Sequence, residues 1–120
     1  MDKRVSVAEL KGRVQEFCEE RDWDQFHGPK DLAIGIVTEA SELLERFRFL
    51  SDAQSNSILA VAAKREQIEH EIADVLFFVL RFAQRFNIDL DESLSRKLKK
   101  NADKYPIEKA RGKNLKYTDL

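Results

Sequence analysis

Apolar residues recur along this chain every three to four positions, which is the spacing of a helix with one buried face. Ser6 and Glu9 have the spacing of a capping box, so the first helix is expected to begin there. The last helix is expected to end by Tyr105, because Pro106 follows it. No segment alternates apolar and polar residues with a period of two, so no strand is predicted. The four predicted helices begin near residue 6, run from 31 to 49, run from 58 or 64 to 86, and run from 89 to 105.

The segments between these helices differ in character. Residues 21–30 are rich in aromatic side chains and contain Gly28 and Pro29, which interrupt a helix, so an ordered connection is expected. Residues 50–57 are polar and are expected to form a loop, and residues 107–120 form a basic tail that can be flexible. No repeat or shift of composition marks a boundary, so we expect a single all-α domain, residues 1–120.

Amino-acid composition favours a helical protein and gives no support for nucleic-acid or membrane partners. The chain is 42% apolar and 36% charged, with four Gly and two Pro, which favours long helices with solvated faces. A net charge of -1 gives no bulk attraction to nucleic acid or to an anionic membrane. Cys18 has no partner for an internal disulfide, and no apolar run approaches the roughly 18 residues that span a bilayer. We therefore expect a cytoplasmic protein with neither nucleic acid nor membrane as partner.

Two helices carry paired carboxylates at the edge of their apolar stripes. Glu39 and Glu42 are three residues apart, and so are Glu71 and Asp74. Glu39 falls about 20° from Leu32 around the helix, at the border of the buried face. Two such helices packed antiparallel would bring the four acids together, where a hard divalent cation such as Mg²⁺ would relieve their repulsion.

Other interpretations of these acids stay open at this point. Acidic pairs at this spacing are ordinary on a solvated helix. Di-iron bundles also use such acids, but they add a His three residues after a Glu, and none follows Glu39, Glu42 or Glu71 in that way. The absence of that histidine favours Mg²⁺ over iron.

A row of cationic and amide side chains marks the predicted helix 89–105. Lys97, Asn101 and Lys104 lie within about 40° of the face that carries Leu90 and Leu94. Such a row suits phosphate oxygens. The alternative is a set of lysines favoured by the helix dipole near the C-terminal end.

The connection 21–30 holds Trp23, Phe26 and His27. These side chains either seal one end of the helical core or provide a wall on which a nucleobase stacks. His70 directly precedes Glu71 and either orients it or is exposed.

Four segments, in this order, resemble the MazG-like all-α nucleoside triphosphate pyrophosphohydrolases, and within them the dCTP pyrophosphatase group. The string around Trp23 resembles the opening of that group, and Lys116-Tyr117-Thr118 resembles its tail. The segments 39–43 and 71–76 resemble its two metal motifs, and 97–106 resembles its phosphate motif. The resemblance covers most of the chain.

The resemblance implies a four-helix MazG-like bundle assembled as a homodimer or as a dimer of dimers (a homotetramer). It implies Mg²⁺, for which Mn²⁺ could substitute, held by carboxylates that also form the catalytic centre. It implies hydrolysis of a nucleoside triphosphate, dCTP or a modified pyrimidine nucleotide among the candidates, to the monophosphate and pyrophosphate. The implied site residues are Glu39, Glu42, Glu71 and Asp74 for metal and catalysis, Lys97, Asn101 and Lys104 for phosphate, and Trp23, His27, Phe49 and Phe78 for the base.

The chain departs from the group's pattern at four positions. Phe49 and Phe78 stand where the group often has Trp and Tyr, Val14 stands where a base-reading His is expected, and His70 replaces an acid. Stacking should survive these changes, whereas the lost polar groups weaken the expectation of cytosine selectivity. A non-catalytic oligomerisation module and a nucleotide sensor remain alternatives.

Overall fold

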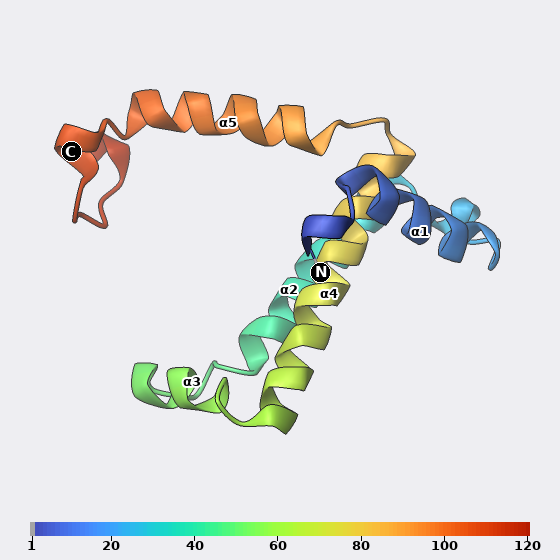
Figure 1. Ribbon diagram of the computed structural model, residues 1–120, viewed down its shortest axis with the longest axis horizontal. Helices are drawn as coiled ribbons and strands as arrows, with labels where there is room; N and C mark the ends of the chain where they lie inside the picture. The colour runs from blue at the N-terminus through green and yellow to red at the C-terminus, as the bar shows by residue number, and fades with distance from the viewer. Residues whose placement is uncertain (1) are drawn as a thin grey trace. The chain divides into compact units, whose positions relative to one another are not determined.

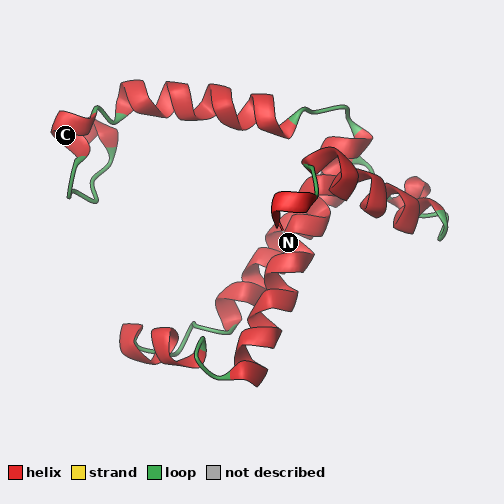
Figure 2. Ribbon diagram, in the orientation of Figure 1, coloured by secondary structure: helices red, strands yellow, loops and turns green. Residues whose placement is uncertain are grey.

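The computed structural model describes residues 2–120, and within that range every regular element is helical (Figure 2). The all-α prediction is therefore confirmed. There are six α-helices and three short 3-10 segments in the described residues. They are η1 (Asp2–Arg4), α1 (Val7–Glu19), η2 (Asp24–Phe26), α2 (Pro29–Glu45), α3 (Asp52–Ile58), α4 (Ala62–Arg85), α5 (Leu90–Lys104), α6 (Ile107–Ala110) and η3 (Tyr117–Asp119).

The chain forms two compact units, Met1–Asn87 and Ile88–Leu120. In the first unit, α1 and α2 both pack on α4, and α2 runs beside α4 along much of its length (Figure 1). The pairing is antiparallel, because Gly35 near the start of α2 meets Phe78 in the second half of α4, whereas Arg46 at the end of α2 meets Gln67 and Glu71.

Local sequence sets several helix ends. Ser6 and Glu9 form the predicted capping box, each bonding the other's backbone N–H, and this prediction is confirmed. Pro29 occupies the first turn of α2, where its missing N–H has no helical partner to lose. Asp89 accepts the Glu92 N–H at the start of α5.

Two sequence predictions are wrong in detail. Residues 50–57 are not a loop, because α3 occupies most of them, begun by a second capping box between Ser51 and Gln54. The predicted helix 31–49 ends at Glu45 instead, since residues 46–50 close into short i→i+3 turns. The tail is also partly helical: α6 and η3 lie within residues 107–120.

The core of the first unit is small. Its fully buried apolar side chains come from α1, α2 and α4, and the close approach of α2 to α4 depends on Gly35, where an added Cβ would lie 2.5 Å from the Phe78 ring. The buried apolar residues are Cys18, Leu32, Ile68, Leu80 and Ala83.

Both paired helices carry exposed apolar side chains. Ile34 and Val37 of α2 are 53% and 69% exposed, and Ile72 and Leu76 of α4 are 52% and 44% exposed. Ile72 and Leu76 belong to the half of α4 that is apolar nearly all round, so part of that apolar surface is not covered within the first unit. Among residues 2–120, no helix combines the length and apolar character that crossing a bilayer requires.

In the second unit, the tail contacts the end of α5. The rings of Tyr105 and Tyr117 lie 6.1 Å apart, edge to face, and Lys104 Nζ lies 4.9 Å from the Tyr117 ring. These contacts give residues 105–117 an ordered place beside the C-terminal turn of α5.

Candidate functional site

The antiparallel pairing of α2 and α4 brings four carboxylates into one cluster. Glu39, Glu42, Glu71 and Asp74 each offer an oxygen, and these oxygens all lie within 4.8 Å of one another. Each helix contributes two acids three residues apart, which the helical period places on one face. The four residues are graded in burial: Glu71 is 8% exposed, Glu39 is half-buried, and Glu42 and Asp74 are exposed.

The cluster is electrostatically strained without a cation. Burial raises the pKa of Glu39, and a hydrogen bond with Glu42 and the charges of Glu42, Asp74 and Glu71 raise it further. Glu71 Oε2 is buried and has no hydrogen-bond partner among the described residues. An all-oxygen donor set with one orphaned buried oxygen fits a hard divalent cation such as Mg²⁺ or Mn²⁺.

Arg46 is a cation at this cluster that the sequence analysis missed. Its Nη2 donates to Glu71 Oε1 at 2.9 Å, and its Nη1 donates to Gln67 Oε1 at 3.2 Å. A hollow of about 270 Å³ lies beside the guanidinium, lined by Glu42, Glu45, Arg46 and Glu71. The available signal was its position, four residues after Glu42 and therefore one helical turn along the same face.

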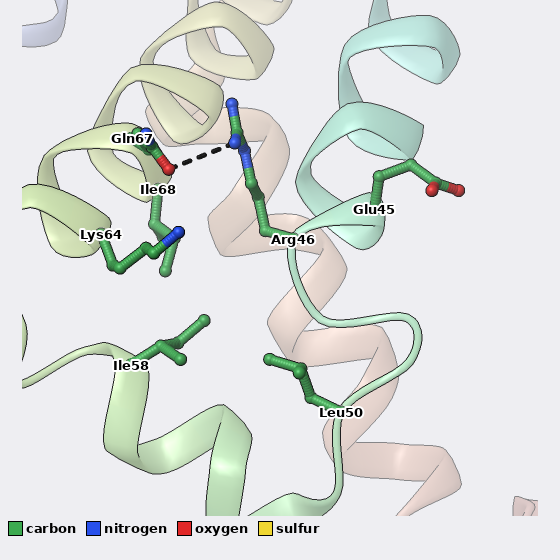
Figure 3. Close-up of a pocket in the computed structure, with 7 residues that line it drawn as sticks. All are labelled: Glu45, Arg46, Leu50, Ile58, Lys64, Gln67 and Ile68. Atoms are coloured by element: carbon green, nitrogen blue, oxygen red, sulfur yellow. Dashed lines mark hydrogen bonds between the residues drawn. The ribbon is translucent and has the colours of Figure 1, made fainter.

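A second hollow of about 350 Å³ adjoins the first, at the end of α2 and the start of α4 (Figure 3). Lys64 points toward it, Arg46 lines it and extends to Gln67, and Leu50, Ile58 and Ile68 form its apolar side. Because Arg46 lines both hollows, one guanidinium links the carboxylates to this mostly apolar recess.

Three of the four predicted base-binding residues, Trp23, His27 and Phe78, belong to one continuous cluster of aromatic rings. Trp23 lies 6.0 Å from the His27 ring and 5.7 Å from Phe17, all measured between ring centroids. Phe17 lies 6.0 Å from Phe77, which lies 5.3 Å from Phe78. Trp23 and His27 are half-buried, so they pack into the unit and still present a surface.

Phe49 does not belong to that cluster of aromatic rings. It is 83% exposed and its contact is the Arg48 guanidinium, 4.9 Å from the ring centroid. Trp23 precedes α2 and Phe49 follows it, and the 17 residues of α2 make a helix about 25 Å long. One copy of the first unit therefore does not bring Phe49 to Trp23.

The predicted phosphate residues lie on α5, in the second unit. Lys97 and Lys104 are exposed and Asn101 is half-buried. The sequence left open whether His70 orients Glu71 or is exposed. Its side chain is 72% exposed and its Nε2 lies 3.9 Å from Glu66 Oε1, so His70 does not orient Glu71.

Comparison with known proteins identifies the family. The model of the MazG-like family matches residues 34–120. The chain belongs to the MazG-like family. The match includes both carboxylate pairs and the α5 row, so the predicted family and the predicted enzyme class, a nucleoside triphosphate pyrophosphohydrolase, are confirmed.

Individual relatives agree with the MazG-like assignment. The chain is 38% identical over 115 residues to dCTP pyrophosphatase 1 of Rattus norvegicus, covering 96% of this chain and 68% of the relative. It is 35% identical over 115 residues to dCTP pyrophosphatase 1 of Homo sapiens, with the same coverage. A pyrophosphatase structure from Archaeoglobus fulgidus superposes with a TM-score of 0.77 and 37% identity, covering 83% of this chain and 92% of that one.

Proposed function

We propose that this MazG-like protein hydrolyses a (deoxy)nucleoside triphosphate between the α- and β-phosphates, releasing the monophosphate and pyrophosphate. The observation that carries the proposal is the cluster of Glu39, Glu42, Glu71 and Asp74, whose oxygens lie within 4.8 Å of one another. The same four residues would hold Mg²⁺, or Mn²⁺ in its place. The relatives named dCTP pyrophosphatase 1 make dCTP or a modified pyrimidine nucleotide the first substrate to test.

The protein residues divide the chemistry between them. A bound divalent cation would supply positive charge that offsets the charge developing on the phosphate oxygens. Lys97, Asn101 and Lys104 would donate hydrogen bonds to the pyrophosphate leaving group. Trp23, His27 and Phe78 would hold the base against an aromatic surface. The attacking water adds its oxygen to the α-phosphate, and the proton it loses passes to a carboxylate or to solvent.

The assembly in this proposal is a homodimer or homotetramer. Ile34 and Val37 of α2 and Ile72 and Leu76 of α4 have exposed apolar side chains that further copies would cover. The distance between Trp23 and Phe49 gives a second copy a role, because its Phe49 would complete the base wall. A cytoplasmic enzyme of this kind would remove surplus or modified nucleotides from the pool.

Mixed assemblies test the shared base wall. Trp23→Ala and Phe49→Ala subunits should each be impaired alone, and a mixture of the two should regain part of the wild-type kcat/KM. The gain is expected because a mixed dimer keeps one site with both aromatic residues. A mixture no more active than its components, despite subunit exchange shown by mass spectrometry, would place both residues of a site in one copy.

The direct test is a panel of common and modified nucleotides incubated with the protein and Mg²⁺, with products identified by phosphorus NMR. We expect pyrophosphate and the monophosphate from at least one nucleotide. Release of orthophosphate alone would refute the proposed bond cleavage. Binding with no turnover would favour a nucleotide sensor.

A matched pair of variants ties the activity to the cluster. Glu71→Gln should abolish pyrophosphate release and remove the rise in melting temperature caused by Mg²⁺, because it deletes the most buried carboxylate. Glu69→Gln is the control on the same helix: Glu69 is 61% exposed and its ion pair is with Arg65, at 3.1 Å. Both variants should keep the far-ultraviolet circular dichroism of the parent.

A further inference from the structure

Arg81 carries a positive charge at a place with no contact to water. It lies on α4, and its side chain is 0% exposed. An arginine stays protonated in proteins, so a buried one needs hydrogen-bond acceptors on all sides. Its Nη2 is ion-paired with Asp24, its Nη1 donates to Gln84 Oε1 at 2.6 Å, and its Nε donates to His27 Nδ1 at 2.9 Å. Two of these three acceptors belong to the aromatic segment that precedes α2.

The bond to His27 fixes the protonation of its ring. Arg81 Nε always carries its hydrogen, so the nitrogen that faces it must accept. An imidazole that accepts through Nδ1 is neutral and carries its proton on Nε2. No hydrogen bond to His27 Nε2 is found among residues 2–120, and that atom is not one of the buried groups without a partner. The Nε2–H group is therefore open to a ligand.

The charges around His27 keep it neutral. Arg81 and Arg85 face it from α4, Asp24 lies on η2, and Asp31 lies on α2. Burial lowers the pKa of His27, the two arginines lower it further, and the two aspartates oppose them. Asp24 is itself shared, since Arg85 Nη1 lies 3.6 Å from its Oδ2. The net effect favours the same neutral ring that the Arg81 bond requires.

The open N–H group lies beside an aromatic face. The His27 ring is 6.0 Å from the Trp23 ring, at an interplanar angle of 63°. A base stacked on Trp23 would thus have its edge near a single hydrogen-bond donor.

We propose that Arg81 is a positioning residue that locks His27 in the Nε2–H form, so that His27 reads a carbonyl oxygen on the edge of the bound base. In a cytosine nucleotide the matching group is the O2 carbonyl. Only the contact between His27 and the base rests on the proposed function. The tautomer itself is a property of the free protein.

Nitrogen-15 NMR of labelled histidine tests the tautomer without any activity. The chain has two histidines, so His70→Gln assigns the signals. At neutral pH we expect a pyridine-type shift for His27 Nδ1 and a pyrrole-type shift for Nε2. Arg81→Met should convert this pattern to a mixture of tautomers. In this variant Asp24 loses its ion pair with residue 81. The Asp24 side chain is 44% exposed and still has Arg85 as a partner, so its charge remains compensated. An Nδ1–H form or an imidazolium in the wild type would overturn the proposal, even if Arg81→Met fails to fold.

Two substitutions of His27 test the reading of the base. Gln offers an acceptor to Arg81 and a donor to the base, whereas Leu offers neither. His27→Leu should raise KM for dCTP about tenfold, with a larger effect on KM than on kcat, and His27→Gln should restore most of it. Wild type should prefer dCTP over its 2-thio analogue, whose sulfur is a weak acceptor, and His27→Leu should lose that preference. Retained preference in His27→Leu would refute the base contact. Absence of pyrophosphate release from every nucleotide would instead refute the proposed function and leave the NMR result standing.

Discussion

Replacing Arg46 by Leu should strengthen metal binding to the protein without nucleotide. Arg46 Nη2 donates to Glu71 Oε1 at 2.9 Å, and Glu71 is a member of the proposed ligand set. The guanidinium repels a cation at this carboxylate, and its hydrogen bond blocks coordination through Oε1. Leu suits the site, because Leu50, Ile58 and Ile68 line the adjoining hollow.

The size of the effect follows from the exposure of the pair. The Arg46 and Glu71 side chains are 40% and 11% exposed, which lies between a surface pair and a buried one. Surface pairs contribute up to about 1 kcal/mol, and a pair with one buried member lies at or above that limit. A loss of about 1 kcal/mol of competition corresponds to roughly fivefold tighter metal binding.

The assay is a titration with Mn²⁺, followed by electron paramagnetic resonance or calorimetry, in low salt and without nucleotide. Arg48→Leu is the matched control. Arg48 lies two residues away and pairs with Glu45 at 3.2 Å, outside the four carboxylates, and both side chains are more than half exposed. Equal or weaker Mn²⁺ binding by Arg46→Leu would show that Arg46 does not compete for the cluster.

Further predictions concern packing and pH. Gly35→Ala should lower the free energy of unfolding by about 1–3 kcal/mol in urea titrations, because the new Cβ meets the Phe78 ring at 2.5 Å. Gly12→Ala is its control: nothing lies within 4 Å, so better helix propensity should stabilise by up to about 1 kcal/mol, and equal effects of the two would refute the packing argument. The raised pKa of Glu39 means that the folded state binds this proton more tightly, so stability from this group falls as pH rises above the ordinary Glu value. Mg²⁺ favours the ionised form, so its stabilising effect on the melting temperature should grow over the same pH range, and a constant increment would contradict the cluster's electrostatics.

The sequence predicted the carboxylate cluster because a fixed helical period determines it. Acids three residues apart share a face of a helix whatever the rest of the fold does. Two such faces at the edges of apolar stripes meet when α2 and α4 pack antiparallel. The family motifs added the order of the segments, which spacing alone does not contain.

The missed features depend on tertiary register or on weak local signals. Arg46 reaches Glu71 only because the end of α2 meets the first half of α4, and a sequence pattern does not set that crossing. Arg81 and His27 are 54 residues apart, and no periodicity relates them. The capping residues Ser51 and Gln54 are visible in the sequence of α3, but the polar composition of this segment favoured the prediction of a loop.

The separation of Trp23 and Phe49 could have been predicted from the sequence. The resemblance placed both in one base wall, while the helix between them has a rise of about 1.5 Å per residue. A helix of 17 residues cannot bring its two ends together. A base wall that uses both residues, as proposed above, would therefore need two copies.

The strongest structural argument for a metal is the free-energy cost that the chain bears without one. Burial and like charges raise the pKa of Glu39, and Glu71 has a buried oxygen with no hydrogen-bond partner within residues 2–120. Within residues 2–120, the ion pair with Arg46 is the one that involves a member of the cluster, and it satisfies one oxygen of Glu71. An all-oxygen cluster with like charges in contact and an unpaired buried oxygen thus matches the ligand preference of a hard divalent cation, which supports the proposed metal.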